Sequence, residues 1–197
     1  KGINVNPKFS MIYNNLGSLY KSLNKTNEAE SYYKKSIEID PNMPEPYNNL
    51  GNLYKTINKH SEAIYNYEKS IEIKPDFFWG HYNLGIENIS IGNFDKARIN
   101  LEKTIQLNEN FSPAHRALSR LTKYNLKNSH LNQMLKIYTN NETNSSQKKE
   151  LAFAIGKAYE DIKDFKKSFS FYKEGNDIHK SRIDFKLVDE TNNFLKI

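Results

Sequence analysis

The sequence repeats itself at a fixed interval, and this interval restricts the fold more than any other feature. Residues 47–54 read Tyr-Asn-Asn-Leu-Gly-Asn-Leu-Tyr, and near or looser copies occupy residues 13–20, 81–88 and 115–122. A recurrence of a few tens of residues is typical of repeat proteins, in which every unit buries its apolar face against its neighbours. The sequence therefore predicts a stack of similar units instead of one globular core.

Each copy has the spacing of a helix. Tyr47, Leu50, Gly51 and Tyr54 fall at i, i+3, i+4 and i+7, which is one face of an α-helix. A second stripe with helical spacing covers residues 63–71, and a proline then ends the unit because it cannot continue a helix. We therefore expect two antiparallel helices per unit, which the glycine allows to approach each other closely.

Pro7, Pro41 and Pro75 recur at the same interval as the copies and mark the ends of units, so the chain is expected to begin inside a repeat of a longer array. The expected units are residues 1–9 as the tail of a truncated preceding repeat, 10–43, 44–77 and 78–111 as three repeats, 112–141 as a degenerate fourth repeat, 142–148 as a polar loop, 149–180 as a fifth, repeat-like pair, and 181–197 as a C-terminal helix.

The turns between the two helices of a unit are marked by Asn24, Asn58 and Gly92. Gly and Asn are the residues that most readily take a left-handed conformation after a helix. Thr26 follows the first of these turns, where its hydroxyl is expected to cap the next helix.

The composition argues against several classes of protein. The 29 Lys and Arg against 23 Asp and Glu give a net charge of +6. The lysines are spread over every repeat instead of forming one stripe, so specific nucleic-acid binding is not expected. Cysteine is absent, which excludes disulfides and thiolate chemistry. No apolar run approaches the ~18 residues of a membrane span, and residues 1–7 do not resemble a signal peptide. We therefore expect a cytoplasmic protein without a membrane partner.

The chain offers little for catalysis. Its repeated glycines lie inside helical patterns, so no phosphate-binding loop is expected, and no His-Glu-x-x-His motif occurs. His81 and His115 lie at equivalent places in adjacent repeats, and we interpret both as filling the aromatic position between helices instead of forming a metal pair. Glu160, Asp161 and Asp164 gather near a helix end, where solvated acids are the simpler interpretation. The sequence predicts no catalytic residue, no cofactor and no metal.

Two helices per repeat, with the order aromatic–x–x–Leu–Gly–x–x–Tyr, then Ala, an aromatic residue and Pro, resemble the tetratricopeptide repeat. The resemblance covers residues 10–122 in register and residues 149–180 as a further unit. It implies an all-α, right-handed solenoid of antiparallel helix pairs whose first helices line a concave groove. It also implies a non-catalytic protein-interaction scaffold, since the family mostly binds other proteins, often as extended segments.

A narrower resemblance implies an alternative function. Residues 151–161, 164–165 and 172–176 resemble the last repeat of bacterial proteins in which a repeat array precedes a sulfotransferase domain. The chain would then be a substrate-presenting or dimerising region of a multidomain sulfotransferase. The Arg-Ser-Gly-Thr type of phosphate-binding loop does not occur in these 197 residues, so the catalytic domain would lie beyond Ile197. The third hypothesis is that the chain is a spacer or an element that mediates oligomerisation, for example as a homodimer.

Asn15, Asn49 and Asn83 recur two residues before the glycine of the first three repeats. Asn is a poor helix former, and this position is offset from the packing face, so it is expected to face the groove. A side-chain amide can pair with both the C=O and the N–H of an extended peptide. The row resembles the asparagine ladder in the tetratricopeptide domain of O-linked N-acetylglucosamine transferase. The alternative is that each amide bonds to a neighbouring repeat and rigidifies the stack. The row stops at Ala117 and Ala154.

Further side chains are expected on the same surface. They are Asn14, Asn48 and Tyr82 one residue before the row, Ser18, Asn52 and Ile86 three residues after it, and Trp79 in the third repeat. Positive potential would come from Lys21, Lys55, Arg116, Arg120 and Lys123. The two-carboxylate clamp of chaperone-binding repeats is not reproduced, because Trp79 and Asn83 stand where that clamp has Lys and Arg. The expected partner is a protein or peptide ligand in an extended conformation.

Overall fold

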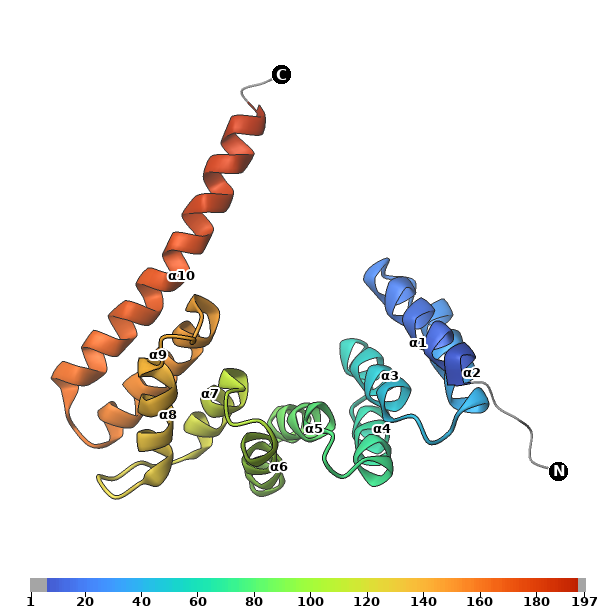
Figure 1. Cartoon of the computed structure of the whole chain (residues 1–197), viewed down its shortest axis with the longest axis horizontal. Coiled ribbons are helices and arrows are strands. Elements are labelled where there is room, and N and C mark those ends of the chain that lie inside the picture. Colours follow the sequence, from blue (N-terminus) through green and yellow to red (C-terminus); the bar gives the residue numbers. More distant parts are fainter. Residues whose placement is uncertain (1–6, 195–197) are drawn as a thin grey trace. The chain divides into compact units, whose positions relative to one another are not determined.

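A computed structural model describes the backbone of residues 7–194 and the side chains of residues 9–181. This part of the chain is all-α, as predicted, and most of its ten helices pack in adjacent antiparallel pairs (Figure 1). The chain divides into two compact units, Lys1–Asn108 and Glu109–Ile197, which we call unit 1 and unit 2. Among the described residues, no helix combines the length and apolar character that crossing a bilayer requires.

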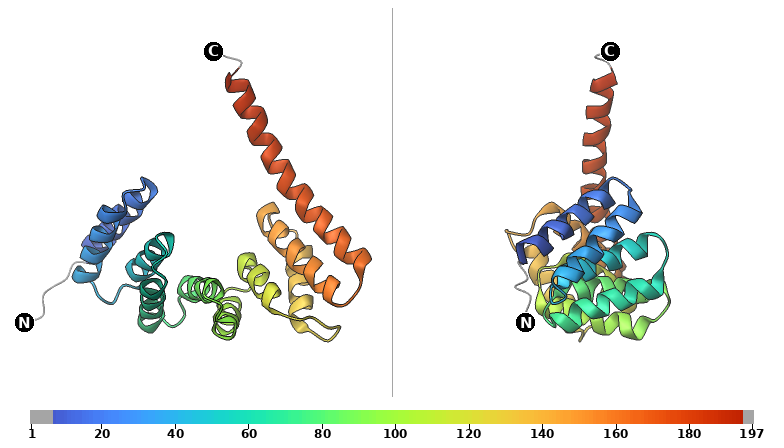
Figure 2. Two further views of the ribbon diagram at one scale, coloured as in Figure 1. Left: turned by 180° about the vertical axis from the view of Figure 1, so that it is seen from behind. Right: turned by 90° about the vertical axis from the view of Figure 1, so that its right-hand side faces the viewer.

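Unit 1 consists of three helix pairs, which follow one another in the left view of Figure 2. The helices are α1 (Pro7–Ser22), α2 (Thr26–Ile39), α3 (Pro44–Thr56), α4 (His60–Ile73), α5 (Phe78–Ser90) and α6 (Phe94–Leu107). The second helix of each pair also packs on the first helix of the next pair, α2 on α3 and α4 on α5. The buried core therefore runs continuously from α2 to α5, with Ala29, Tyr33, Leu50, Ala63 and Tyr67 almost completely buried.

The turns between the paired helices have the predicted chemistry. Asn24 and Asn58 have φ of 58° and Gly92 has φ of 79°, which is the left-handed region that Asn and Gly tolerate best. The predicted cap at Thr26 is wrong. Thr26 is the first residue of α2, and the capping position belongs to Lys25, whose side chain makes no capping bond.

Gly51→Ala is expected to lower the free energy of unfolding by about 2 kcal/mol. A methyl carbon at Gly51 would lie 2.6 Å from Cε1 of Tyr67, a ring that is fully buried and anchored by its hydroxyl to Asn52. Gly85→Ala is the matched control, because the nearest atom there is Cγ of Leu101 at 3.0 Å. Urea denaturation followed by circular dichroism measures both, and a Gly85→Ala loss as large as that of Gly51→Ala would contradict the account.

Unit 2 departs from the regular pairing at its start. Its helices are α7 (Ser112–Leu121), α8 (Ser129–Thr139), α9 (Ser145–Asp161) and α10 (Phe165–Phe194). In the region expected to be a degenerate repeat, α7 packs mainly on α9, which also contacts α8. The last pair, α9 and α10, packs through Gly156, whose missing side chain leaves room for the ring of Tyr172.

Two expected boundaries in unit 2 differ from the structure. The polar loop expected at residues 142–148 is shorter, because α9 begins at Ser145, where Asn144 and Gln147 form a capping box. The C-terminal helix expected at residues 181–197 is not separate, because α10 runs without a break from Phe165 to Phe194. Residues 1–6 of the expected N-terminal tail, and residues 195–197, lie outside the described part.

Candidate functional site

The first helices of the three pairs form one side of unit 1. α1 contacts α3, and α3 contacts α5, whereas within the described residues no contact of similar extent joins α2 to α4 or α4 to α6. Helices that touch along a row lie on the inside of a curve, so the exposed sides of α1, α3 and α5 form the inner face of unit 1. The inner face is the surface on which the sequence placed the asparagine row.

The structure shows what the asparagines bond to. Nδ2 of Asn49 donates to Oδ1 of Asn14 at 2.9 Å, and Nδ2 of Asn83 donates to Oδ1 of Asn48 at 2.8 Å. The acceptors Asn14 and Asn48 are each 7% exposed. Each bond joins the first helices of neighbouring repeats, so these amides hold the stack together, as the alternative interpretation expected.

The bonds between repeats use only part of the hydrogen-bonding capacity of the asparagine row. Asn49 and Asn83 remain half-buried, and each bond occupies one of two donors and neither lone pair of the amide oxygen. Asn15 has no preceding repeat in the described chain to bond to. It is exposed, and its side chain makes no hydrogen bond within the described residues. The inner face therefore carries three side-chain amides with acceptor capacity and at least one donor each.

The predicted neighbours of the row take two forms. Ser18 lies 3.2 Å from the hydroxyl of Tyr33, and Oδ1 of Asn52 accepts from the hydroxyl of Tyr67 at 2.9 Å. In the third repeat the equivalent pair is Ile86 and Leu101, both apolar. A polar residue is thus present in the repeats whose core tyrosine needs a hydrogen-bond partner. Ser18 and Asn52 therefore have a structural reason in addition to a functional one.

An aromatic patch occupies the third repeat. Trp79 is 43% exposed and lies beside Phe78 and Tyr82, with ring centroids 4.9 and 6.4 Å away. Although Trp79 packs on these rings, almost half of its surface remains open. Exposed aromatic groups with an apolar body and a polar tip are frequent anchors in protein interfaces.

The five candidate basic residues differ in their partners. Nη1 of Arg116 lies 2.6 Å from Glu150, and Nζ of Lys123 lies 3.0 Å from Asp161, so both charges in unit 2 are compensated. Arg120 is exposed on α7.

The other two, Lys21 and Lys55, lie on α1 and α3 in unit 1, and both are partly buried. Burial lowers the pKa of the Lys21 amine, and the nearby charge of Lys55 lowers that pKa further.

The two histidines occupy equivalent sites within their own units. His81 places Nε2 2.9 Å from the carbonyl oxygen of Pro75, and His115 places Nε2 2.7 Å from that of Glu109. In both, the ring reaches the chain six residues earlier, which is a structural role. The described residues contain no group of three His, Asp or Glu side chains that could hold a metal ion.

His115 continues into a hydrogen-bonded chain that sequence reasoning missed. Its Nδ1 lies 2.8 Å from Nε2 of His130, and Nδ1 of His130 lies 2.7 Å from the hydroxyl of Tyr124. The carbonyl of Glu109 can only accept, so His115 carries its proton on Nε2. It follows that His130 donates from Nε2 and that Tyr124 donates to His130. Burial lowers the pKa of both imidazoles, that of His130 to about 4.

A second missed pair lies between the second and third repeats. Glu87 on α5 is fully buried, and its Oε1 lies 2.5 Å from Nδ1 of His60 on α4. The other oxygen, Oε2, has no hydrogen-bond partner among the described residues. The positions equivalent to Glu87 in the first two repeats are Leu19 and Leu53, so a charged residue in a leucine position was the available signal.

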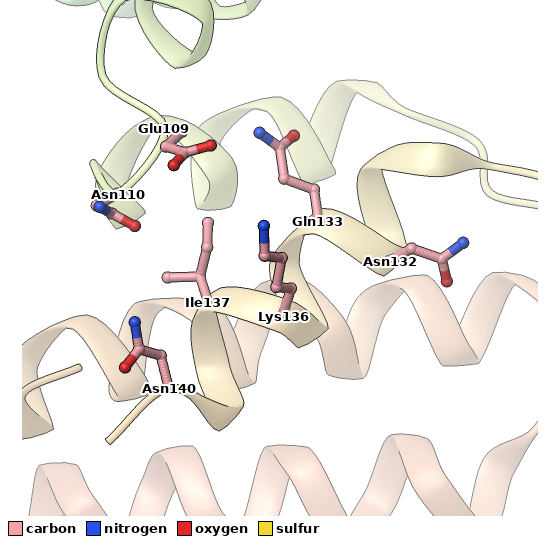
Figure 3. Close-up of a pocket in the computed structure, with 7 residues that line it drawn as sticks. All are labelled: Glu109, Asn110, Asn132, Gln133, Lys136, Ile137 and Asn140. Atoms are coloured by element: carbon pink, nitrogen blue, oxygen red, sulfur yellow. The ribbon is translucent and has the colours of Figure 1, made fainter. Parts of the chain in front are cut away.

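Unit 2 contains a hollow of about 440 Å³, shown in Figure 3. Its lining consists of Glu109, Asn110, Asn132, Gln133, Lys136, Ile137 and Asn140. Ile137 is buried, whereas the polar members of this lining are exposed or half-buried, so none of them is a buried polar group aimed at a ligand. We assign this hollow no role.

Comparison with known proteins agrees with the repeat geometry. Residues 12–43 and residues 44–77 each match a model described as tetratricopeptide repeat. A search of curated protein sequences gives no match.

Among solved structures, the crystal structure of MamA is similar, with a TM-score of 0.63 and 23% identity over 86% of this chain and 97% of that one. YrrB, described as a TPR protein with an unusual peptide-binding site, has a TM-score of 0.63 and 21% identity over 87% of each chain. The first TPR of Spaghetti (RPAP3), bound to an HSP90 peptide, has a TM-score of 0.58 and 20% identity over 61% of this chain and 95% of that one. At these identities the likeness shows the fold alone.

Proposed function

We propose that this chain, in which residues 12–77 match two tetratricopeptide repeat models, is a non-catalytic interaction scaffold. Its ligand is an extended polypeptide that lies along the inner face of unit 1. Two of the similar structures are described by peptide binding, one by an unusual peptide-binding site and one by a bound HSP90 peptide. They support this class of ligand without identifying it.

The observation that carries the proposal is the spare hydrogen-bonding capacity of the asparagine row. Asn49 and Asn83 are held in place by their bonds to Asn14 and Asn48. Their free oxygen lone pairs and second N–H groups are therefore fixed before a ligand arrives, which reduces the entropy lost on binding. An extended backbone presents C=O and N–H groups that such amides can pair with, whatever its side chains are.

The binding energy expected from this row is modest. A hydrogen bond contributes about 0.5–1.5 kcal/mol net, so three amides making two bonds each give roughly 3–9 kcal/mol before ordering costs. Binding with a dissociation constant below the micromolar range would therefore need additional side-chain contacts. The aromatic patch around Trp79 is available for such contacts.

Asn15→Ala separates function from stability. Because the Asn15 amide is exposed and unbonded within the described residues, its loss is expected to weaken peptide binding about threefold to tenfold and to leave the melting temperature unchanged. Asn27→Ala, at an exposed position on α2, is the control and should alter neither. Peptides selected from a random display library, titrated by fluorescence anisotropy, provide the readout. Unchanged affinity in Asn15→Ala for every selected peptide would count against the proposed site.

Asn83→Ala should differ from Asn15→Ala by affecting both properties. It removes the bond to Asn48 and leaves a 7% exposed amide oxygen without its donor. We expect a loss of about 1–2 kcal/mol in the free energy of unfolding in addition to weaker peptide binding. Urea denaturation measures the first effect. Stability equal to that of the unmodified chain would contradict the structural role of this bond.

A further inference from the structure

Two lysines on the inner face lack an acidic partner in the described part of the chain. Lys21 on α1 and Lys55 on α3 occupy equivalent positions in the first and second repeats, and the two helices are in contact. Both side chains are partly buried, and within the described residues neither forms an ion pair. On the second helix of the first repeat, by contrast, Lys34 is paired with Glu30 at 2.6 Å.

The surroundings of Lys21 disfavour its charge in the absence of a ligand. Burial removes water from the Lys21 amine and lowers its pKa, and the positive charge of Lys55 acts in the same direction. Partly dehydrated like charges raise the free energy of the unliganded protein. A carboxylate between them would remove the repulsion and accept charge-assisted hydrogen bonds.

The lysines end polar columns on their helices. On α1, Ser18 and Lys21 follow Asn14 at i+4 and i+7, so the three share a face. The corresponding column is Asn48, Asn52 and Lys55 on α3, and Tyr82, Ile86 and Ile89 on α5. This column is therefore polar and cationic on the first two repeats and apolar and aromatic on the third.

We propose, on the basis of the proposed function, that the bound polypeptide carries an acidic side chain that binds between Lys21 and Lys55. The same polypeptide carries a large apolar side chain that packs on the patch of Trp79 and Tyr82. Neighbouring helices lie about 8–10 Å apart, and an extended chain advances about 3.3 Å per residue. Because α5 is one helix away from Lys55 and two from Lys21, the two ligand side chains are about three to six residues apart.

The test uses synthetic peptides of about ten residues with one Glu and one Phe separated by four positions in a Gly-Ser-Ala background. Acetylated and amidated ends remove the terminal charges, and the matched peptide has Gln in place of Glu. The 197-residue chain is compared with the Lys21→Gln/Lys55→Gln variant. Lys74→Gln/Lys96→Gln is the control, because it also removes two lysines of unit 1. Both are exposed; Lys74 is the C-cap residue of α4, and Lys96 lies on α6.

We expect the unmodified chain and the control to bind the Glu peptide about fivefold to tenfold more tightly than the Gln peptide. The Lys21→Gln/Lys55→Gln variant should bind both peptides alike. Equal binding of both peptides to the unmodified chain would overturn this inference and leave the proposed function standing. Discrimination that persists in the Lys21→Gln/Lys55→Gln variant would also overturn it. Failure of every peptide, including library-selected ones, to bind would overturn the proposed function and this inference together.

Discussion

His60→Ala is expected to lower the free energy of unfolding by about 3 kcal/mol. His60 is the hydrogen-bond partner of the fully buried Glu87, whose second carboxylate oxygen has no partner among the described residues. Removing the partner of a buried acidic group costs up to about 3–5 kcal/mol, because the group is left buried alone. The His60 side chain is 44% exposed, so water can partly replace it, and the lower end of that range applies.

Glu87→Leu is the informative companion to His60→Ala. The equivalent residue one repeat earlier is Leu53, which is 1% exposed, so the site accepts leucine in this fold. Replacing a buried pair by apolar residues is often neutral or stabilising. We therefore expect Glu87→Leu to change stability by less than about 1 kcal/mol and to rescue His60→Ala in the double variant. Urea denaturation of the four chains forms a complete cycle, and a double variant as unstable as His60→Ala would refute the explanation.

Unit 2 is expected to lose about 3 kcal/mol of stability between pH 6.5 and pH 4. Burial lowers the pKa of His130 to about 4, below the ordinary value of about 6.5. The unfolded chain therefore takes up a proton before the folded chain does. The stability contributed by the neutral form is complete above pH 6.5 and falls by about 1.4 kcal/mol per pH unit as the pH drops toward 4. His115, whose pKa burial also lowers, acts in the same direction.

The geometry explains why the pair stays neutral. A proton added to Nδ1 of His115 would face the N–H of His130 across 2.8 Å. A proton added to Nδ1 of His130 would reverse the bond from Tyr124 and add positive charge beside Lys157, whose Nζ lies 5.3 Å from the centre of the Tyr124 ring. Acid therefore breaks a chain of bonds that holds α7, α8 and the segment between them together.

A variant at His130 tests the origin of the acid effect. His130→Phe keeps a ring in the stack with His115 and Tyr124 but cannot titrate, so its stability should vary less between pH 6.5 and 4. His179→Phe, at an exposed position of α10, is the control and should follow the unmodified chain. The lowered carboxyl pKa values at Glu150 and Asp161 also reduce stability as the pH falls below about 4–5, but they do so equally in His130→Phe and in the unmodified chain. An unmodified acid profile in His130→Phe would rule out the histidine pair as the cause.

The fold of unit 1 follows from the sequence because its causes are local or periodic. The turns at Asn24, Asn58 and Gly92 depend on one residue each, and the close approach of Tyr67 to Gly51 repeats at fixed spacing. In unit 2 the periodic signal fades. The polar run before Gln147 predicts a loop, although Asn144 caps a helix there.

The asparagine row shows where sequence reasoning stops. The recurrence of asparagine identifies Asn49 and Asn83. Their hydrogen-bond partners, however, depend on the orientation of one repeat relative to the next. The observed bonds to Asn14 and Asn48 join positions 35 residues apart, an interval set by stacking instead of by helical spacing. Peptide binding by the row and the link to a sulfotransferase both stay predictions.

The pairs His60–Glu87 and His115–His130 were missed for a related reason. Each joins two helices through side chains whose chemistry is unremarkable until the helices are packed. Only Glu87, in a position that is leucine in the three other copies of the repeat, departs from the pattern in a way that the sequence alone displays.

Tryptophan fluorescence tests the central claim most directly. Trp79 is the only tryptophan of the chain, 43% of its surface is exposed, and the sequence predicts that it lies on the inner face. Titration with library-selected peptides should shift its emission to shorter wavelength and reduce acrylamide quenching, with the same dissociation constant that anisotropy of the labelled peptide gives. Peptides that bind by anisotropy yet leave both the emission and the quenching of Trp79 unchanged would place the binding site elsewhere and contradict the account.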